Sequence, residues 1–220
     1  MNLIGIDLDG TLEDSRRDMI AAVQRVRARF GLPKRPDAVL APWINQGMDP
    51  LYRRCFDDYL VAGAASACLD EVRRAYEIDY HAHVAVETRL YPGVAAALDQ
   101  LASLGRVVVV TNKPEKISRR LLEALAVDQC IAAVIGGDSC AAVKPDPAML
   151  CAAAGRVGFD PKSGMAVMIG DTTGDIEMGR GFGARTVWCA WGYSAAPGAP
   201  PDFTAQKPDE LPGLVQAALR

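Results

Sequence analysis

The 220-residue sequence has no long basic run, no Cys-x-x-Cys motif and no apolar stretch that approaches membrane-spanning length. Its acidic and basic residues are intermixed, and the formal net charge is -3. The sequence therefore has no cluster of basic residues that could neutralise several nucleic-acid phosphates. A transmembrane helix needs about 20 predominantly apolar residues in succession. We find no internal repeat either. We therefore expect neither nucleic acid nor a membrane as a partner.

The six cysteines are widely scattered and mostly lie in apolar stretches, at positions 55, 68, 130, 140, 151 and 189. This distribution favours reduced thiols in the core over a disulfide framework. The N-terminus leads directly into an apolar segment that contains Asp7 and Asp9, which is unlike a signal peptide. We expect a cytoplasmic protein.

Half of the residues are apolar, enough for one sizeable core and a smaller second domain. Short apolar runs typical of buried parallel strands lie at 3–8, 106–110, 132–135, 166–169 and 185–188. Helix-like segments lie between the later runs, at 92–104, 114–125 and 147–157. This alternation predicts a doubly wound α/β fold with right-handed crossovers.

Residues 15–86 interrupt the alternation. Apolar residues recur there with helical spacing over 16–30, 50–61 and 68–83, with turns at 33–36 and 62–64. We predict that residues 15–86 form an inserted helical domain and that residues 1–14 and 87–220 form the α/β core. Residues 195–201 are predicted to be an exposed loop before a short final helix.

The sequence Asp7-Leu8-Asp9-Gly10-Thr11-Leu12 follows the first predicted strand. Ligands of open parallel sheets bind at the carboxyl ends of the strands. Carboxylates two residues apart on an extended chain point to the same side, and Gly10 permits a sharp turn beside a ligand. The pattern indicates a ligand site, and the alternative interpretation is an Asp-Gly turn that ends a strand.

A second acidic motif, Gly170-Asp171-Thr172-Thr173-Gly174-Asp175, follows the apolar run 166–169. Asp171 and Asp175 can supply the hard oxygen ligands that Mg²⁺ prefers. Asp175 can instead cap the helix that follows, where an acid suits the helix dipole.

Two further segments carry groups that suit phosphate. Thr111-Asn112 offers a hydroxyl and backbone N–H groups at a helix entrance, although a simple turn is the alternative. Lys144, in Lys144-Pro145-Asp146-Pro147, would neutralise nearby carboxylates and bind a transferred phosphoryl group, whereas an isolated Lys-Pro pair is typical of a solvated loop.

In this order, and each after a strand, the four segments resemble the signature motifs of the haloacid dehalogenase superfamily, from Asp7 to Asp175. The phosphoglycolate phosphatase branch is most similar, on the first motif with Glu13-Asp14-Ser15, and on Tyr91-Pro92-Gly93-Val94, Thr111-Asn112-Lys113-Pro114 and Trp191-Gly192-Tyr193. The resemblance implies a Rossmann-like core with a central parallel sheet and an inserted all-helical cap. It also puts the first strand at the centre, between the strands that end in Thr111 and Asp171.

The resemblance further implies a Mg²⁺-dependent phosphatase that acts on a small phosphorylated metabolite through an aspartyl-phosphate on Asp7. Asp9 would act as acid and then as base, and Lys144 would assist. The implied metal ligands are Asp7, Asp9 through its backbone carbonyl, and Asp171, with Asp175 orienting Lys144 or a metal-bound water. The implied phosphate-binding residues are Gly10, Thr11, Thr111, Asn112 and Lys144. Candidate substrate contacts in the cap are residues 45–48, Arg53 and Arg54.

Several alternatives stay open at this point. A phosphosugar mutase would form the same intermediate and return the phosphate to a sugar, and a pyrophosphatase or nucleotidase would use the same core. A haloacid dehalogenase does not need the acid at Asp9, and a phosphonate-cleaving enzyme would need a cap lysine, for which residues 15–86 offer only Lys34. The intact acids argue against a silent binding module. The substrate, and whether the chain is a monomer or a homodimer, are left open.

Overall fold

The computed structural model describes residues 1–44, 46–61 and 65–220, and they fall into two compact units. Unit 1 comprises Met1–Asp14 and Leu90–Arg220, and unit 2 comprises Ser15–Arg89. The roles of these units as catalytic core and cap stay predictions.

Unit 1 is built on a six-stranded sheet in the order β5-β4-β1-β6-β7-β8, in which all neighbours are parallel. The strands are β1 (Leu3–Ile6), β4 (Arg106–Val110), β5 (Ala133–Ile135), β6 (Ala166–Gly170), β7 (Arg185–Cys189) and β8 (Phe203–Ala205). β1 is buried along its whole length, as expected for a central strand with both faces covered. The predicted position of β1 between β4 and β6 is confirmed.

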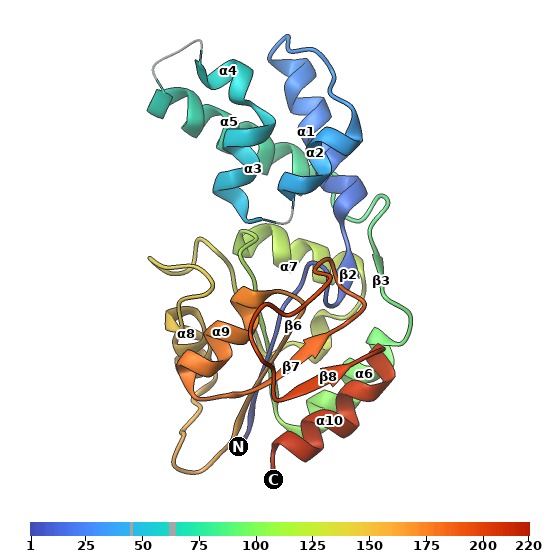
Figure 1. Ribbon diagram of the computed structural model, residues 1–220, viewed down its shortest axis with the longest axis vertical. Helices are drawn as coiled ribbons and strands as arrows, with labels where there is room; N and C mark the ends of the chain where they lie inside the picture. The colour runs from blue at the N-terminus through green and yellow to red at the C-terminus, as the bar shows by residue number, and fades with distance from the viewer. Residues whose placement is uncertain (45, 62–64) are drawn as a thin grey trace. The chain divides into compact units, whose positions relative to one another are not determined.

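Helices cover both faces of this sheet. They are α6 (Val94–Leu104), α7 (Glu115–Ala124), α8 (Ala148–Val157), α9 (Thr173–Phe182) and α10 (Leu211–Ala218), with short 3₁₀ helices at Asp128–Cys130 and Pro208–Glu210. α6 packs against α10, α8 packs against α9, and Figure 1 shows the two pairs on opposite faces. The predicted α/β fold with a central parallel sheet is confirmed.

The register of the central strands determines which loops meet. Ile6, the last residue of β1, pairs with Val109 of β4 and with Ile169 of β6. The N–H of Asp7 continues the ladder by donating to the carbonyl of Ile169 over 2.9 Å. Since the strands are parallel and in step, the segments that follow them leave the sheet at one edge.

Unit 2 is helical in its described part, with α1 (Arg16–Arg29), α2 (Asp37–Ile44), α3 (Met48–Cys55), α4 (Asp57–Val61) and α5 (Ala65–Ala82). Arg27 of α1 is fully buried, and its guanidinium donates to both carboxylate oxygens of Asp58, at 2.9 and 2.6 Å, and to the carbonyls of Pro33 and Cys55. The short strands β2 (Glu13–Asp14) and β3 (Arg89–Leu90) form a separate two-stranded sheet.

Some local predictions were wrong. The predicted helix over 50–61 is two helices, because the chain breaks at Phe56, whose φ is -130°. Helix α2 was missed because it contains Pro42, which removes one helical donor. Strand β8 was missed between the predicted loop and the final helix, and Cys151, expected in the core, is exposed. The predicted turn at 62–64 and the candidate contact Asn45 lie outside the described residues.

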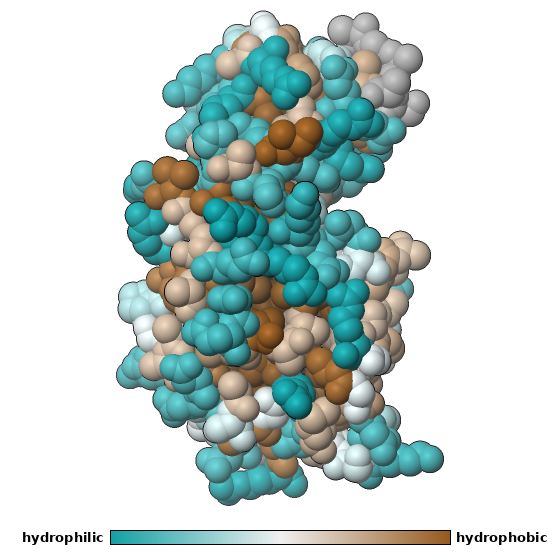
Figure 2. Space-filling view, turned by 180° about the vertical axis from the view of Figure 1, so that it is seen from behind, coloured by the Kyte–Doolittle hydropathy of each residue, from teal (hydrophilic) through white to brown (hydrophobic). Residues whose placement is uncertain are grey.

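Within the described ranges, no helix is long and apolar enough to cross a membrane. Large exposed hydrophobic residues belong to different segments of the two units, and Figure 2 shows hydrophilic and hydrophobic residues interspersed on one side of the molecule. They are Met1, Val39, Ile78, Val86, Val143 and Met165.

Candidate active site

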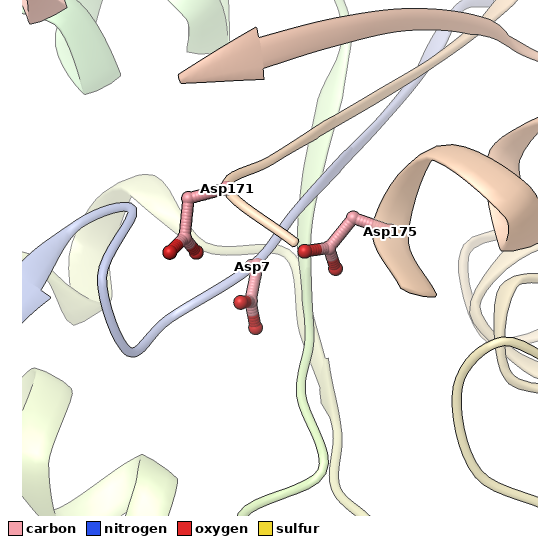
Figure 3. A group of neighbouring side chains, drawn as sticks. All are labelled: Asp7, Asp171 and Asp175. Atoms are coloured by element: carbon pink, nitrogen blue, oxygen red, sulfur yellow. The ribbon is translucent and has the colours of Figure 1, made fainter. Parts of the chain in front are cut away.

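Three aspartates meet at the carboxyl edge of the sheet. Asp7 follows β1, Asp171 follows β6, and Asp175 lies in the first turn of α9. Each contributes a carboxylate oxygen to a group whose members lie within 4.8 Å of one another, and all three residues are buried. Figure 3 shows the three carboxyl groups gathered around a common space. The two acidic motifs are therefore brought together, as the strand order predicts.

Lys144 reaches this group from the loop between β5 and α8. Its Nζ lies 2.5 Å from Oδ1 of Asp7 and 2.7 Å from Oδ1 of Asp175, and its side chain is 6% exposed. Burial alone would lower the pKa of Lys144, but the charges of Asp175 and Asp7 outweigh burial and raise that pKa. The ammonium group of Lys144 therefore lies between two aspartates whose charges favour its protonated form.

The acids are nevertheless in excess over this one lysine. Burial raises the pKa of Asp7 well above its usual value, the charge of Asp175 raises it further, and Lys144 opposes both effects. Burial, followed by the charge of Asp175, also raises the pKa of Asp171 to about 6. These shifts reflect carboxylates that repel one another in a poorly solvated space, which is an environment that stabilises a divalent cation.

Both carboxylate oxygens of Asp171 are held by the protein. The Thr11 hydroxyl donates to Oδ1 over 3.1 Å, and the backbone N–H of Tyr193 donates to Oδ2 over 2.7 Å. The indole N–H of Trp188 donates to the carbonyl of Asp171 over 3.2 Å. The orientation of Asp171 is thus fixed by residues from three segments. Thr11 thus contacts this carboxylate, and its predicted binding of phosphate stays a prediction.

Two glycines allow the backbone to approach Asp171 closely. Gly10 has φ +83°, and a Cβ there would lie 2.5 Å from Oδ2 of Asp171. A Cβ on Gly192 would lie 2.1 Å from the Cβ of Asp171. Real Cβ atoms are not found at such distances, so larger residues at either position would displace the carboxylate.

Asp175 caps a helix, which is one of the two roles that the sequence left as alternatives, and its binding of Mg²⁺ stays a prediction. Its Oδ2 accepts hydrogen bonds from the N–H and the hydroxyl of Thr172, at 3.0 and 2.6 Å, which caps the start of α9. Its Oδ1 contacts Lys144. One carboxylate therefore caps the start of α9 and contacts Lys144.

The side chain of Asp9 contacts Lys113, whose side chain is 1% exposed. The fully buried Glu13 lies 3.9 Å from the same ammonium group. The sequence reasoning missed Lys113 as a site residue, although it directly follows Thr111-Asn112 at the carboxyl edge of β4. That position in the motif was the available signal.

Thr111 and Asn112 follow β4 on this same edge. The Thr111 hydroxyl is buried and accepts a hydrogen bond from the backbone N–H of Lys113 over 3.1 Å. The side-chain oxygen of Asn112 accepts a hydrogen bond from the backbone N–H of Lys144 over 3.1 Å. Asn112 thus links the segment after β4 to the loop that carries Lys144. Binding of phosphate by these residues stays a prediction.

The candidate substrate contacts of unit 2 have partners within that unit. Arg53 donates to Asp49 over 2.7 Å, and the guanidinium of Arg54 lies 5.1 Å from the ring centroid of Trp43. Their role in substrate binding stays a prediction.

The family model described as haloacid dehalogenase-like hydrolase matches residues 4–189. The chain belongs to this family. Curated relatives named phosphoglycolate phosphatase include that of Haemophilus influenzae, 34% identical over 87% of both chains, and that of Aquifex aeolicus, 30% identical over 98% of this chain and 97% of the relative. The resemblance predicted from the motifs is confirmed at the level of the family and of its phosphoglycolate phosphatase-like relatives.

Solved structures agree with this assignment. The crystal structure of a predicted phosphoglycolate phosphatase from Haemophilus somnus has a TM-score of 0.83, with 28% identity over 98% of both chains. CbbY from Rhodobacter sphaeroides, with 19% identity and a TM-score of 0.72 over 96% of both chains, shares the fold.

Proposed function

We propose that this protein is a Mg²⁺-dependent phosphatase that releases phosphate from a small metabolite of the 2-phosphoglycolate type through an aspartyl-phosphate on Asp7. The observation that carries the proposal is the position of Asp7 at the carboxyl edge of the sheet, against Lys144 and beside Asp171. The names of the curated relatives support the substrate class.

The donor set fits Mg²⁺. Three buried carboxylates supply hard oxygen atoms, and their combined negative charge exceeds the single positive charge of Lys144, which contacts Asp7 and Asp175. Asp7, Asp171 and the backbone carbonyl of Asp9 would hold the ion, with Asp175 beside them. When bound, the ion would supply the positive charge that lets an anionic carboxylate approach an anionic phosphate.

In the first step the carboxylate of Asp7 attacks phosphorus while the bond between phosphorus and the organic oxygen breaks. Asp9 donates its proton to that leaving oxygen. In the second step Asp9 removes a proton from water, which attacks the aspartyl-phosphate, releases inorganic phosphate and regenerates Asp7. Splitting the hydrolysis in two replaces one high barrier with two lower ones.

The remaining residues bind and orient the phosphoryl group. Lys144 is suited to neutralise its oxygens because the Lys144 ammonium already lies against the nucleophile. Gly10, Thr11, Thr111 and the backbone of Asn112 would supply further contacts. In the same proposal residues 1–14 and 87–220 act as the catalytic core, and residues 15–86 act as the cap that selects the organic part of the substrate.

The test is phosphate release by the wild type and by Asp7→Asn from 2-phosphoglycolate, sugar phosphates, mononucleotides and pyrophosphate, with Mg²⁺ or with EDTA. Asp70→Asn, at an exposed helical position, is the matched control. We expect release that requires both Mg²⁺ and Asp7 and is fastest with 2-phosphoglycolate. Mass spectrometry of acid-quenched enzyme should find one phosphoryl group on the Asp7 peptide. Near-normal turnover by Asp7→Asn would refute the mechanism.

A further inference from the structure

Two segments bring groups to the site from neighbouring strands. Residues 111–115, here the threonine turn, follow β4, and residues 136–144, here the lysine loop, follow β5 and end at Lys144. The two are linked at both ends of the lysine loop. Near its start the N–H of Gly137 donates to the carbonyl of Lys113 over 3.0 Å, and at its end the N–H of Lys144 donates to Asn112.

Glu115 is the centre of the contacts between these segments. Its backbone N–H donates to Oδ1 of Asp138 over 2.7 Å, and its Oε2 accepts a hydrogen bond from the hydroxyl of Ser139 over 2.5 Å. Its other oxygen, Oε1, accepts hydrogen bonds from Arg119 and Arg156, at 2.8 to 2.9 Å. These donors hold the pKa of Glu115 below its usual value although burial opposes them. Glu115 is therefore the first residue of α7, its carboxylate is held by arginines of α7 and α8, and it forms hydrogen bonds with the lysine loop.

The hydroxyl of Ser139 also stabilises the loop itself, because it accepts a hydrogen bond from the N–H of Gly136 over 2.9 Å. The backbones are in close contact at this point. A Cβ on Gly136 would lie 2.2 Å from the nitrogen of Glu115, and a Cβ on Gly137 would lie 2.4 Å from the carbonyl oxygen of Asn112. The lysine loop thus lies directly against the threonine turn, with little freedom to shift.

None of these contacts involves Asp7, Asp171 or Asp175, yet they determine where the loop that delivers Lys144 begins. We propose that Glu115 and Ser139 are positioning residues, which fix the lysine loop on the threonine turn and thereby hold the ammonium of Lys144 against Asp7. The functional consequence rests on the proposed phosphatase activity. Displacement of a transition-state contact by a fraction of an ångström lowers turnover without a comparable change in substrate binding.

The decisive variant is Ser139→Ala, which removes both hydrogen bonds of the hydroxyl. With 2-phosphoglycolate we expect kcat to fall about tenfold to a hundredfold, while KM changes by less than about threefold. Ser139→Thr keeps the hydroxyl and should restore most of the activity. Ser103→Ala is the matched control, because its exposed hydroxyl donates only to the carbonyl of Gln100 in α6, and it should behave as the wild type.

Hydrogen exchange supplies a readout that does not depend on activity. In Ser139→Ala the peptides that cover residues 136–147 should exchange faster than in the wild type, in Ser139→Thr they should not, and Ser103→Ala should leave them unchanged. If the wild type released no phosphate from any substrate, the proposed function would fail. Hydrogen exchange alone would still test whether Ser139 and Glu115 hold the lysine loop on the threonine turn. Unaltered exchange in Ser139→Ala, or a Ser139→Thr enzyme as slow as Ser139→Ala, would overturn the inference.

Discussion

The backbone N–H of Tyr193 donates a 2.7 Å hydrogen bond to Oδ2 of Asp171, a residue 22 positions earlier in the chain. To form this bond, the backbone next to Tyr193 passes so close to the side chain of Asp171 that only a glycine fits, and the residue there is Gly192. The group of Asp7, Asp171 and Asp175 thus depends on a segment that contributes no carboxylate to it.

Substitution of Gly192 should therefore weaken metal binding. In Gly192→Ala the new methyl group would overlap the side chain of Asp171, so we expect the affinity for Mg²⁺ to fall about tenfold or more. Titration calorimetry with Mg²⁺ measures this directly. Gly213→Ala is the control, since a Cβ at that helical position meets nothing within 4 Å. Equal affinities in the two variants would contradict the role assigned to Gly192.

Removal of the Lys113 ammonium should affect both stability and turnover. Lys113→Met leaves the buried Glu13 and the nearby Asp9 without this cation, and loss of one partner of a buried ion pair costs about 3 kcal/mol. Urea unfolding measures the free energy, and steady-state kinetics should show a reduced kcat because Asp9 is no longer held. The exposed Lys116→Met is the matched control on the adjacent helix. A Lys113→Met protein as stable and active as this control would exclude the role.

Unit 2 should lose stability in acid through Asp58. Hydrogen bonds from Arg27 are the main reason that the pKa of Asp58 lies below its usual value. A lowered folded-state pKa means that the contribution is fully present above the usual pKa of an aspartate, about 3.9, and is lost as pH falls through the folded pKa. We expect Asp58→Asn to be less stable than the wild type by about 1–3 kcal/mol near neutral pH, and this difference should shrink in acid. Urea unfolding at a series of pH values tests both statements. A difference that persisted at the lowest pH would argue against the pair.

The cysteines should differ sharply in reactivity. Burial raises the pKa of the Cys55 thiol to about 12, whereas Cys151 is exposed. Since the thiolate is the reactive species, an alkylating reagent near neutral pH should modify Cys151 and spare Cys55 in the folded protein. Peptide mass spectrometry distinguishes the two, and urea-unfolded protein, in which both should react, is the control. Equal labelling of both in the folded state would show that α3 opens readily.

The architecture could be predicted from the sequence where a strand is an unbroken run of buried apolar residues. Strand β4 was predicted with its observed bounds, because four adjacent valines are typical of a strand covered on both faces. Strand β8 has only three residues at the edge of the sheet, and α2 contains a proline. Neither segment therefore shows a clear periodicity of apolar residues in the sequence. Short elements of this kind are fixed by packing against the rest of the chain.

The candidate site also has a part that the sequence predicted and a part that it did not. That Asp7, Asp171 and Lys144 approach one another followed from strands that end at a common edge. The contacts of Lys113 with Asp9, and of Ser139 with Glu115, were not predicted, because they depend on side-chain rotamers and on the path of a loop. Sequence motifs indicate which groups arrive at the edge, whereas the structure determines which of them meet.

Asp175 couples the start of a helix to the orientation of the site lysine. The same carboxylate closes the first turn of α9 through Thr172 and faces Lys144 with its other oxygen. Formation of the helix therefore aims one oxygen at the lysine before any substrate is present. If the proposed phosphatase activity is correct, this part of the site needs no rearrangement at each turnover, because the fold that contains α9 already holds it in place.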